Sequence, residues 1–178
     1  MKAMMLLSVV SLATSASLAA GHKESKDGDL SDHGLAPTAV VLKTGANTIA
    51  GKFGSVVKRD GTRVDLDYLT FTVPKGQALD SIYLDPKTDV GGAFSFIGLQ
   101  AGDQFTVPPN GSSAAELLGW AHFGSGDEGR NLLPDIAAGP GAIGFVPPLG
   151  PGTYSVWLQE LAVCACKYRL VFNIGTRK

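Results

Sequence analysis

Short stretches of alternating apolar and polar residues occur along most of the chain and predict β-strands. The clearest is 65–73, where Leu69, Phe71 and Val73 fall on one face and the residues between them on the other. Turn residues bound similar stretches at 39–43, 47–53, 79–84, 93–99, 152–161 and 167–174. The short link between the last two stretches predicts that they pair as a hairpin.

Residues 108–148 lack this alternation and predict a long irregular insertion. Ser113 and Glu116 fit a helix-capping box at the start of a short helix. Residues 131–138 predict a further helical turn, which Pro134 limits. We therefore expect an all-β, jelly-roll-like β-sandwich of seven to nine strands over residues 38–176, with one or two short helices in the insertion.

The N-terminal region has the features of an export signal. Residues 1–19 contain a basic start, an apolar run of about ten residues and small residues before Ala20, the pattern of a secretory signal peptide cleaved after Ala19. Residues 20–37 are polar and charged, and predict a flexible tail. We expect a secreted or periplasmic protein with no membrane anchor once the signal is removed.

The bulk composition fits this picture and limits the partners. The 178 residues include 23 Gly and 10 Pro, as expected for many turns, and 44% are hydrophobic, enough to form a core. The formal net charge is −1, so there is no excess of basic residues to bind nucleic acid. The oligomeric state does not follow from the sequence.

No catalytic motif can be recognised, and we expect a protein that is not an enzyme. Two of the three histidines, His22 and His33, fall in the predicted tail, which leaves His122 as the one candidate for a catalytic dyad or triad. A hydrolase that uses His122 with acidic residues is the alternative from the enzyme class.

Acidic residues gather before the strand at 65–73. Asp60, Asp65 and Asp67 could supply oxygen ligands to Ca²⁺, and Asp65 and Asp67 share one face of an extended segment. Asp27 and Asp29 could join them only if the tail folds back. The alternative is a solvated strand entrance whose charges discourage edge pairing.

The two cysteines, Cys164 and Cys166, are separated by one residue. An even number in an exported chain favours a disulfide, but the ring would be very small. A local bridge and exposed thiols both remain open.

The aromatic residues offer candidates for ligand binding. On its strand, Trp157 faces opposite to Tyr154, Val156 and Leu158, so it is exposed if those three are in the core. Trp120 and His122, in the insertion, are further candidates. The alternative is that these rings belong to the core or its rim.

Two segments resemble a known family. Residues 65–76 run from Asp-x-Asp through an alternating strand to Val-Pro-x-Gly, and 151–158 contain Gly-x-Tyr before a final strand at 168–172. These resemble the bacterial pre-peptidase C-terminal (PPC) domain. Residues 117–124 look like a subgroup of uncharacterised secreted proteins. Many members of that subgroup carry a C-terminal sorting tail with an apolar helix, and we see no such helix in this sequence.

The resemblance implies a jelly-roll-like sandwich that is not itself an enzyme, in a family some of whose members bind extracellular polymers or Ca²⁺. We therefore expect a secreted, non-catalytic binding module for extracellular polysaccharide or protein. An envelope or matrix structural component without a small ligand is the other alternative.

Overall fold

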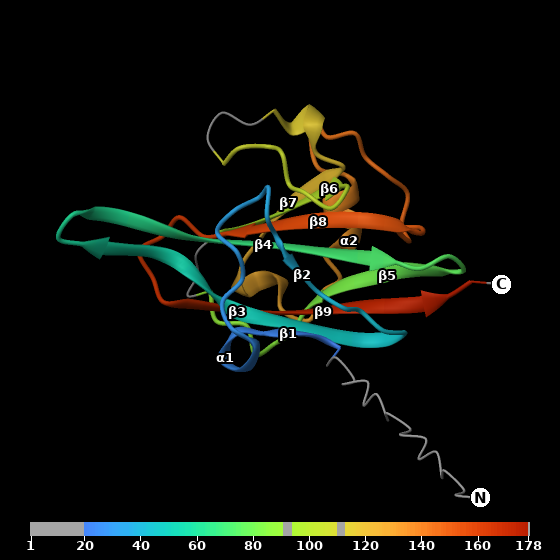
Figure 1. The fold of residues 1–178 in the computed structure, drawn as a ribbon, viewed down its shortest axis with the longest axis horizontal. Coiled ribbons are helices and arrows are strands. Elements are labelled where there is room, and N and C mark those ends of the chain that lie inside the picture. The colour runs from blue at the N-terminus through green and yellow to red at the C-terminus, as the bar shows by residue number, and fades with distance from the viewer. Residues whose placement is uncertain (1–19, 91–93, 110–112, 178) are drawn as a thin grey trace, which may run out of the picture.

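A computed structural model describes residues 20–90, 94–109 and 113–177, and it confirms the all-β sandwich class with short helical elements. Nine strands form one sheet in the order β5-β9-β3-β4-β8-β6-β7, with β1 beside β3 and β2 beside β4 (Figure 1). The strands are β1 (Gly21–Lys23), β2 (Thr38–Ala39), β3 (Gly45–Lys58), β4 (Gly61–Val73), β5 (Gln77–Leu84), β6 (Ser95–Ala101), β7 (Gly119–Phe123), β8 (Gly152–Gln159) and β9 (Cys166–Thr176).

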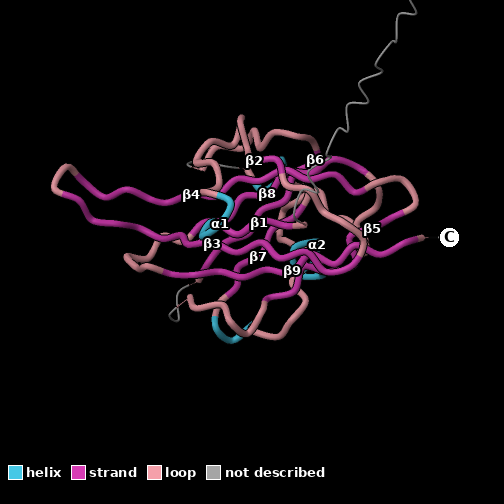
Figure 2. Tube along the Cα trace, turned by 60° about the horizontal axis from the view of Figure 1, so that its bottom comes forward, coloured by secondary structure: helices cyan, strands magenta, loops and turns pink. Residues whose placement is uncertain are grey.

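The sheet folds over into two layers because β3 and β4 change partners along their length. In layer A, residues 45–53 of β3 pair with β9, which also pairs with β5. In layer B, residues 66–73 of β4 pair with β8, and β6 joins β8 to β7. Beyond these segments, 54–58 pair with 61–65 as a two-stranded arm that projects from the body (Figure 2).

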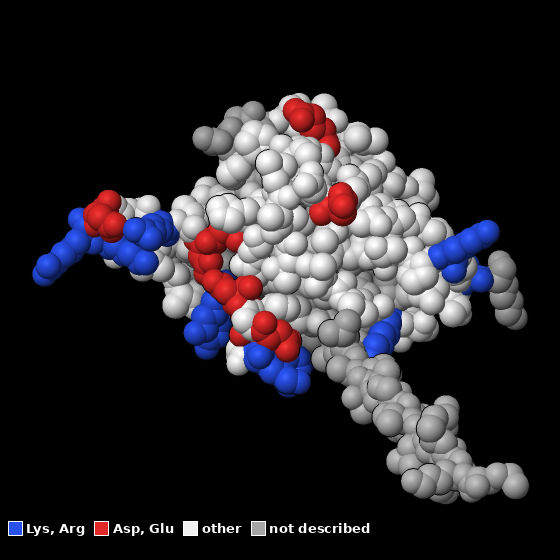
Figure 3. Space-filling model, viewed as in Figure 1, with Lys and Arg blue, Asp and Glu red and all other residues white. Residues whose placement is uncertain are grey.

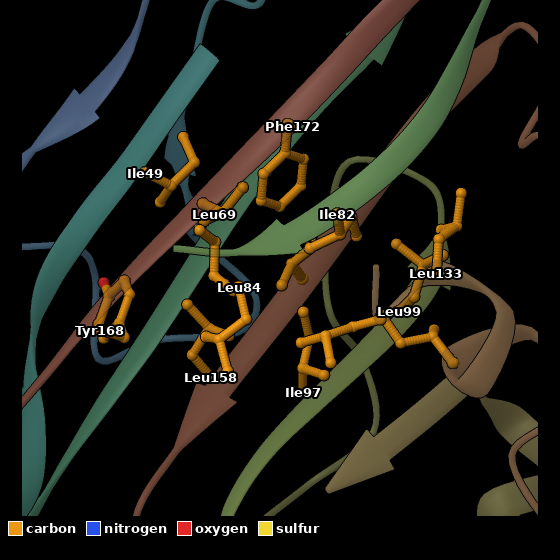
Figure 4. Close-up of a cluster of buried hydrophobic side chains, with 14 of the residues drawn as sticks. Ile49, Leu69, Ile82, Leu84, Ile97, Leu99, Leu133, Leu158, Tyr168 and Phe172 are labelled. Atoms are coloured by element: carbon orange, nitrogen blue, oxygen red, sulfur yellow. The ribbon is translucent and has the colours of Figure 1, made fainter. Parts of the chain in front are cut away.

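The core fills the space between the two layers. Leu69 and Leu158 of layer B face Phe172 and Tyr168 of layer A, and all four are buried (Figure 4). The rings of Phe71 and Phe172 meet edge to face across the layers, with centroids 5.6 Å apart. The alternation predicted for 65–73 is confirmed, since its apolar face is the core face.

The prediction of a flexible tail at 20–37 is wrong, because this N-terminal segment lies along both layers. β1 pairs with β3 in parallel, and Leu30 is buried in the core. Gly21 permits the close approach, since a Cβ there would lie 2.2 Å from the Thr48 carbonyl oxygen. Farther along, the Ser31 carbonyl accepts from the Tyr68 amide at 2.9 Å.

Two strand predictions also need correction. β8 and β9 do not pair as a hairpin, because the link between them crosses from layer B to layer A. The insertion is less irregular than expected, because 119–123 form the edge strand β7 against β6. The strand expected at 39–43 is shortened to β2, whereas β3 extends five residues past its expected end at 53 and into the arm.

The helical elements are short. The α-helices are α1 (Glu24–Asp27) and α2 (Leu133–Ala137), and 3₁₀ turns occupy Ala114–Glu116 and Ser125–Asp127. Ser113 caps the first of these turns, as the capping pattern predicted, and accepts from the Ala115 amide at 3.3 Å. Among the described residues, no helix has the length and apolar content needed to cross a bilayer.

Two remaining predictions concern covalent features. Cys164 and Cys166 are joined by a disulfide, with Cα atoms 5.2 Å apart, which lies inside the range that a bridge allows. The predicted signal peptide, 1–19, lies outside the described residues.

Candidate functional site

Four aromatic side chains line a hollow on the outer face of layer B, which we call the aromatic hollow. Phe96 comes from β6, Trp120 and His122 from β7 and Trp157 from β8, and the volume is about 340 Å³. In register, Gly98 of β6 stands between Trp120 and Trp157. A side chain there would meet the Phe96 ring at about 3.0 Å, so the glycine gives the rings room.

The rings of the hollow pack against one another and are held in place. Phe96 lies 4.7 Å from Trp157 and 6.1 Å from Trp120, measured between ring centroids. The Trp120 indole N–H donates to the Pro140 carbonyl at 3.1 Å, and His122 meets the Trp120 ring edge to face at 5.5 Å. Trp120 is half-buried and His122 exposed, so both present surface to solvent.

The structure therefore brings together the three residues singled out for ligand binding, but the expected exposure of Trp157 is wrong. Trp157 is only 5% exposed, in a second small core with Tyr68, Phe105, Val107 and Leu117. The loop that follows β6 covers the outer face of layer B at this point, so Trp157 forms the floor of the hollow rather than an open platform.

His122 does not have the surroundings of a catalytic histidine. Its Nδ1 lies 3.3 Å from the Ser95 carbonyl oxygen, and no described carboxylate forms a hydrogen bond or ion pair with it. The Ser95 hydroxyl donates to Glu160 at 2.9 Å instead, and both of these residues are buried. Among the residues that the structure describes, the nucleophile, base and orienting acid of a hydrolase are not assembled around this ring.

A second group of side chains, the acidic cluster, forms where the N-terminal segment crosses the base of the arm (Figure 3). It comprises Glu24, Asp29, Asp32, Asp65 and Asp67. Carboxylate oxygens of Glu24, Asp29 and Asp67 all lie within 4.8 Å of one another. None of the five forms an ion pair within the described part of the chain.

Asp67 occupies the most unusual position in the cluster, on the core face of β4. It is fully buried, and neither carboxylate oxygen has a hydrogen-bond partner among the described residues. The nearby Tyr168 hydroxyl forms its hydrogen bond with Glu24 Oε1, at 3.3 Å. Its proximity lowers the pKa of Asp67, but by less than burial and the Glu24 charge raise it. Burial, reinforced by the Glu24 charge, raises the pKa of Asp67 to about 9.

The neighbouring acids respond to the same crowding. Burial and the charges of Asp29, Asp32 and Glu24 raise the pKa of Asp65 to about 6. Burial is also the main cause that raises the pKa of Glu24, although its Oε2 accepts from the Lys52 amide at 2.8 Å.

The ligand set predicted for Ca²⁺ is partly wrong. Asp60 lies at the tip of the arm, where it is exposed and pairs with Arg63 at 3.0 Å, outside the acidic cluster. Asp65 and Asp67 both belong to the cluster, as expected. Asp27 instead accepts from the Lys23 amide at 2.8 Å, whereas Asp29 enters the cluster because the segment folds back.

No family model, curated protein or solved structure matches this chain. The resemblance to the PPC domain therefore stays a prediction.

Sequence reasoning missed Glu24 and Phe96, and it named Asp29 only as a ligand that would join if the tail folded back. The signal that the segment folds back was Leu30, a large apolar residue within a polar segment, which is 3% exposed and anchors the segment in the core. Phe96 gave no separate signal, because an aromatic residue inside a strand looks like any other β-former.

Proposed function

We propose that this chain is a non-catalytic binding module that recognises an extracellular polysaccharide through the aromatic hollow. The observation that carries this proposal is the convergence of Phe96, Trp120, His122 and Trp157 around one hollow open to solvent. Aromatic faces offer flat apolar surface at low conformational cost, and the His122 edge adds a polar group at the rim.

The size of the hollow favours a repeating polymer over a large single ligand. At about 340 Å³ it lies near the lower end of the range for small-molecule pockets. It would hold one ring of a chain, with neighbouring units left outside. A protein ligand that inserts a single side chain is the variant of the proposal that the test must separate.

The hydrolase alternative has less support. His122 lies against aromatic rings and a backbone carbonyl, and the buried hydroxyl of Ser95 is bonded to Glu160. A site with stacked rings, and with no acid–base pair assembled by the described residues, is suited to binding.

Replacing Trp120 with alanine should weaken polymer binding about tenfold, because the half-buried indole supplies the largest solvent-facing ring of the hollow. The measurement is retention on insoluble polysaccharides and on a glycan array, with dissociation constants for the polymers that retain the wild type. Trp120 is a better choice than Trp157, whose removal would empty the second core.

Tyr83→Ala is the matched control, since Tyr83 is a solvent-exposed aromatic residue on β5 of the other layer. It should bind as the wild type does. Equal binding by the wild type and Trp120→Ala, or retention of the wild type by none of the polymers, would remove the polysaccharide proposal. Binding to a protein surface lost in Trp120→Ala would assign the hollow to a protein ligand.

A further inference from the structure

The acidic cluster contains a buried carboxylate, Asp67, whose burial the aromatic hollow does not explain. A carboxylate is almost never fully buried without a partner, since desolvation of the charge is costly and the remaining lone pairs need donors. Asp67 is fully buried, and neither of its oxygens has a hydrogen-bond partner among the described residues. The side chains nearest to its oxygens include two further acids, Glu24 and Asp29, which makes the arrangement less favourable still.

A bound cation resolves all of these problems together. Carboxylate oxygens from Glu24, Asp29 and Asp67 lie within 4.8 Å of one another. Oxygen ligands at 2.3–2.6 Å from Ca²⁺ lie at most about 5 Å apart across the ion, so one ion can contact all three groups. A positive ion would supply the missing partner of Asp67 and remove the mutual repulsion.

We propose that Glu24, Asp29 and Asp67 bind Ca²⁺, which fastens the N-terminal segment to strand β4. The ligand set consists of hard oxygens with no histidine or cysteine, which favours Ca²⁺ over Zn²⁺. Asp65 lies beside the site and adds negative charge that attracts the ion. This inference is independent of the proposed polysaccharide binding, because the aromatic hollow contains none of these residues.

The backbone around Glu24 is shaped to hold its carboxylate at this point. Gly51 of β3 lies directly beneath it, and a Cβ there would come within 2.3 Å of Glu24 Oε1 and 2.5 Å of the Tyr168 hydroxyl. The Lys52 amide donates to the other Glu24 oxygen. A side chain at position 51 would therefore displace the first ligand without changing any charge.

The ligands come from two parts of the chain, and this gives the ion a structural effect. Glu24 and Asp29 belong to the N-terminal segment, whereas Asp67 lies in the core strand β4. The ion would connect the two and hold the segment against the layers. Lys23 and Lys26, exposed on either side of Glu24, are then protected from trypsin when Ca²⁺ is bound.

The test compares chelated protein with protein in millimolar Ca²⁺. At a tenfold excess over Kd, Ca²⁺ should raise Tm by about 3 °C, slow tryptic cleavage after Lys26 and give a calorimetric binding isotherm. Asp67→Asn and Glu24→Gln should each abolish the shift while circular dichroism stays that of the wild type. Gly51→Ala should weaken Ca²⁺ binding at least about tenfold, as expected when a ligand is displaced.

Asp60→Asn is the matched control, because Asp60 is an exposed acid at the arm tip and outside the site. It should keep the full response to Ca²⁺. Absence of a Tm shift and of a binding isotherm in the wild type would overturn the proposal. So would a Ca²⁺ response that survives in Asp67→Asn, or one that is lost in Asp60→Asn.

Discussion

Truncating Phe172 to alanine should lower the free energy of unfolding by about 3–5 kcal/mol, because it removes a fully buried ring from the centre of layer A. Phe172 meets Phe71 of layer B edge to face, so its loss also breaks a contact between the layers. For a chain of this length Tm should fall by about 10 °C. Thermal and urea unfolding followed by circular dichroism measure both quantities.

Val57→Ala is the control for this truncation, since Val57 lies on the arm and is 65% exposed. Its effect should stay within about 0.5 kcal/mol. A similarly small effect at Phe172 would mean that the two layers do not pack through this ring, and the sandwich itself would then be in question.

Local alternation carried most of the prediction of the fold. The pattern in 65–73 identified both the strand and its core face, since the period of two is a local property of the sequence. Strand pairing is not local. Nothing in residues 152–176 distinguishes a hairpin from two strands in different layers, and the structure separates β8 from β9. Local alternation also does not show where β3 and β4 leave their layers and pair with each other as the arm.

The candidate sites were likewise predictable only as far as they depend on local sequence. Trp120, His122 and Trp157 were chosen as single aromatic or polar residues, and register across β6 is what brings them together. The burial of Trp157 could not be predicted from its own strand, because the cover comes from Phe105 and Leu117, which are far away in sequence. Composition suggested a free tail at 20–37, yet the buried apolar residue Leu30 and backbone pairing with β3 hold it.

The N-terminal segment also links the two sites. The Gly34 carbonyl accepts from the Phe105 amide at 2.7 Å, and Phe105 packs against Trp157 with ring centroids 5.7 Å apart. The segment that begins in the acidic cluster therefore ends against the loop that covers the floor of the aromatic hollow. Loss of the segment should loosen that floor as well as the cluster.

In the presence of a chelator, the free energy of unfolding should fall as the pH rises from about 4 to about 9, and Asp67 should cause much of that fall. Burial raises the pKa of Asp67 from its ordinary value of 3.8 to about 9 in the folded protein. Between these values the folded chain holds a proton that the unfolded chain releases. Stability should therefore fall progressively as the pH rises through that window.

Asp67→Asn removes the titrating group without changing the shape of the side chain. The free energy of unfolding of this variant should therefore change little with pH in that window. At pH 8 it should exceed that of the wild type. The groups that face Asp67, namely Glu24, Asp29, Asp65 and Tyr168, are present in both proteins. The difference between the two urea-unfolding profiles therefore isolates Asp67. Asp65→Asn should flatten the profile only between about pH 4 and pH 6, because the pKa of Asp65 is raised to about 6. Parallel profiles for the wild type and Asp67→Asn would show that Asp67 is ionised in the folded protein, and hence that its carboxylate has a partner or solvent.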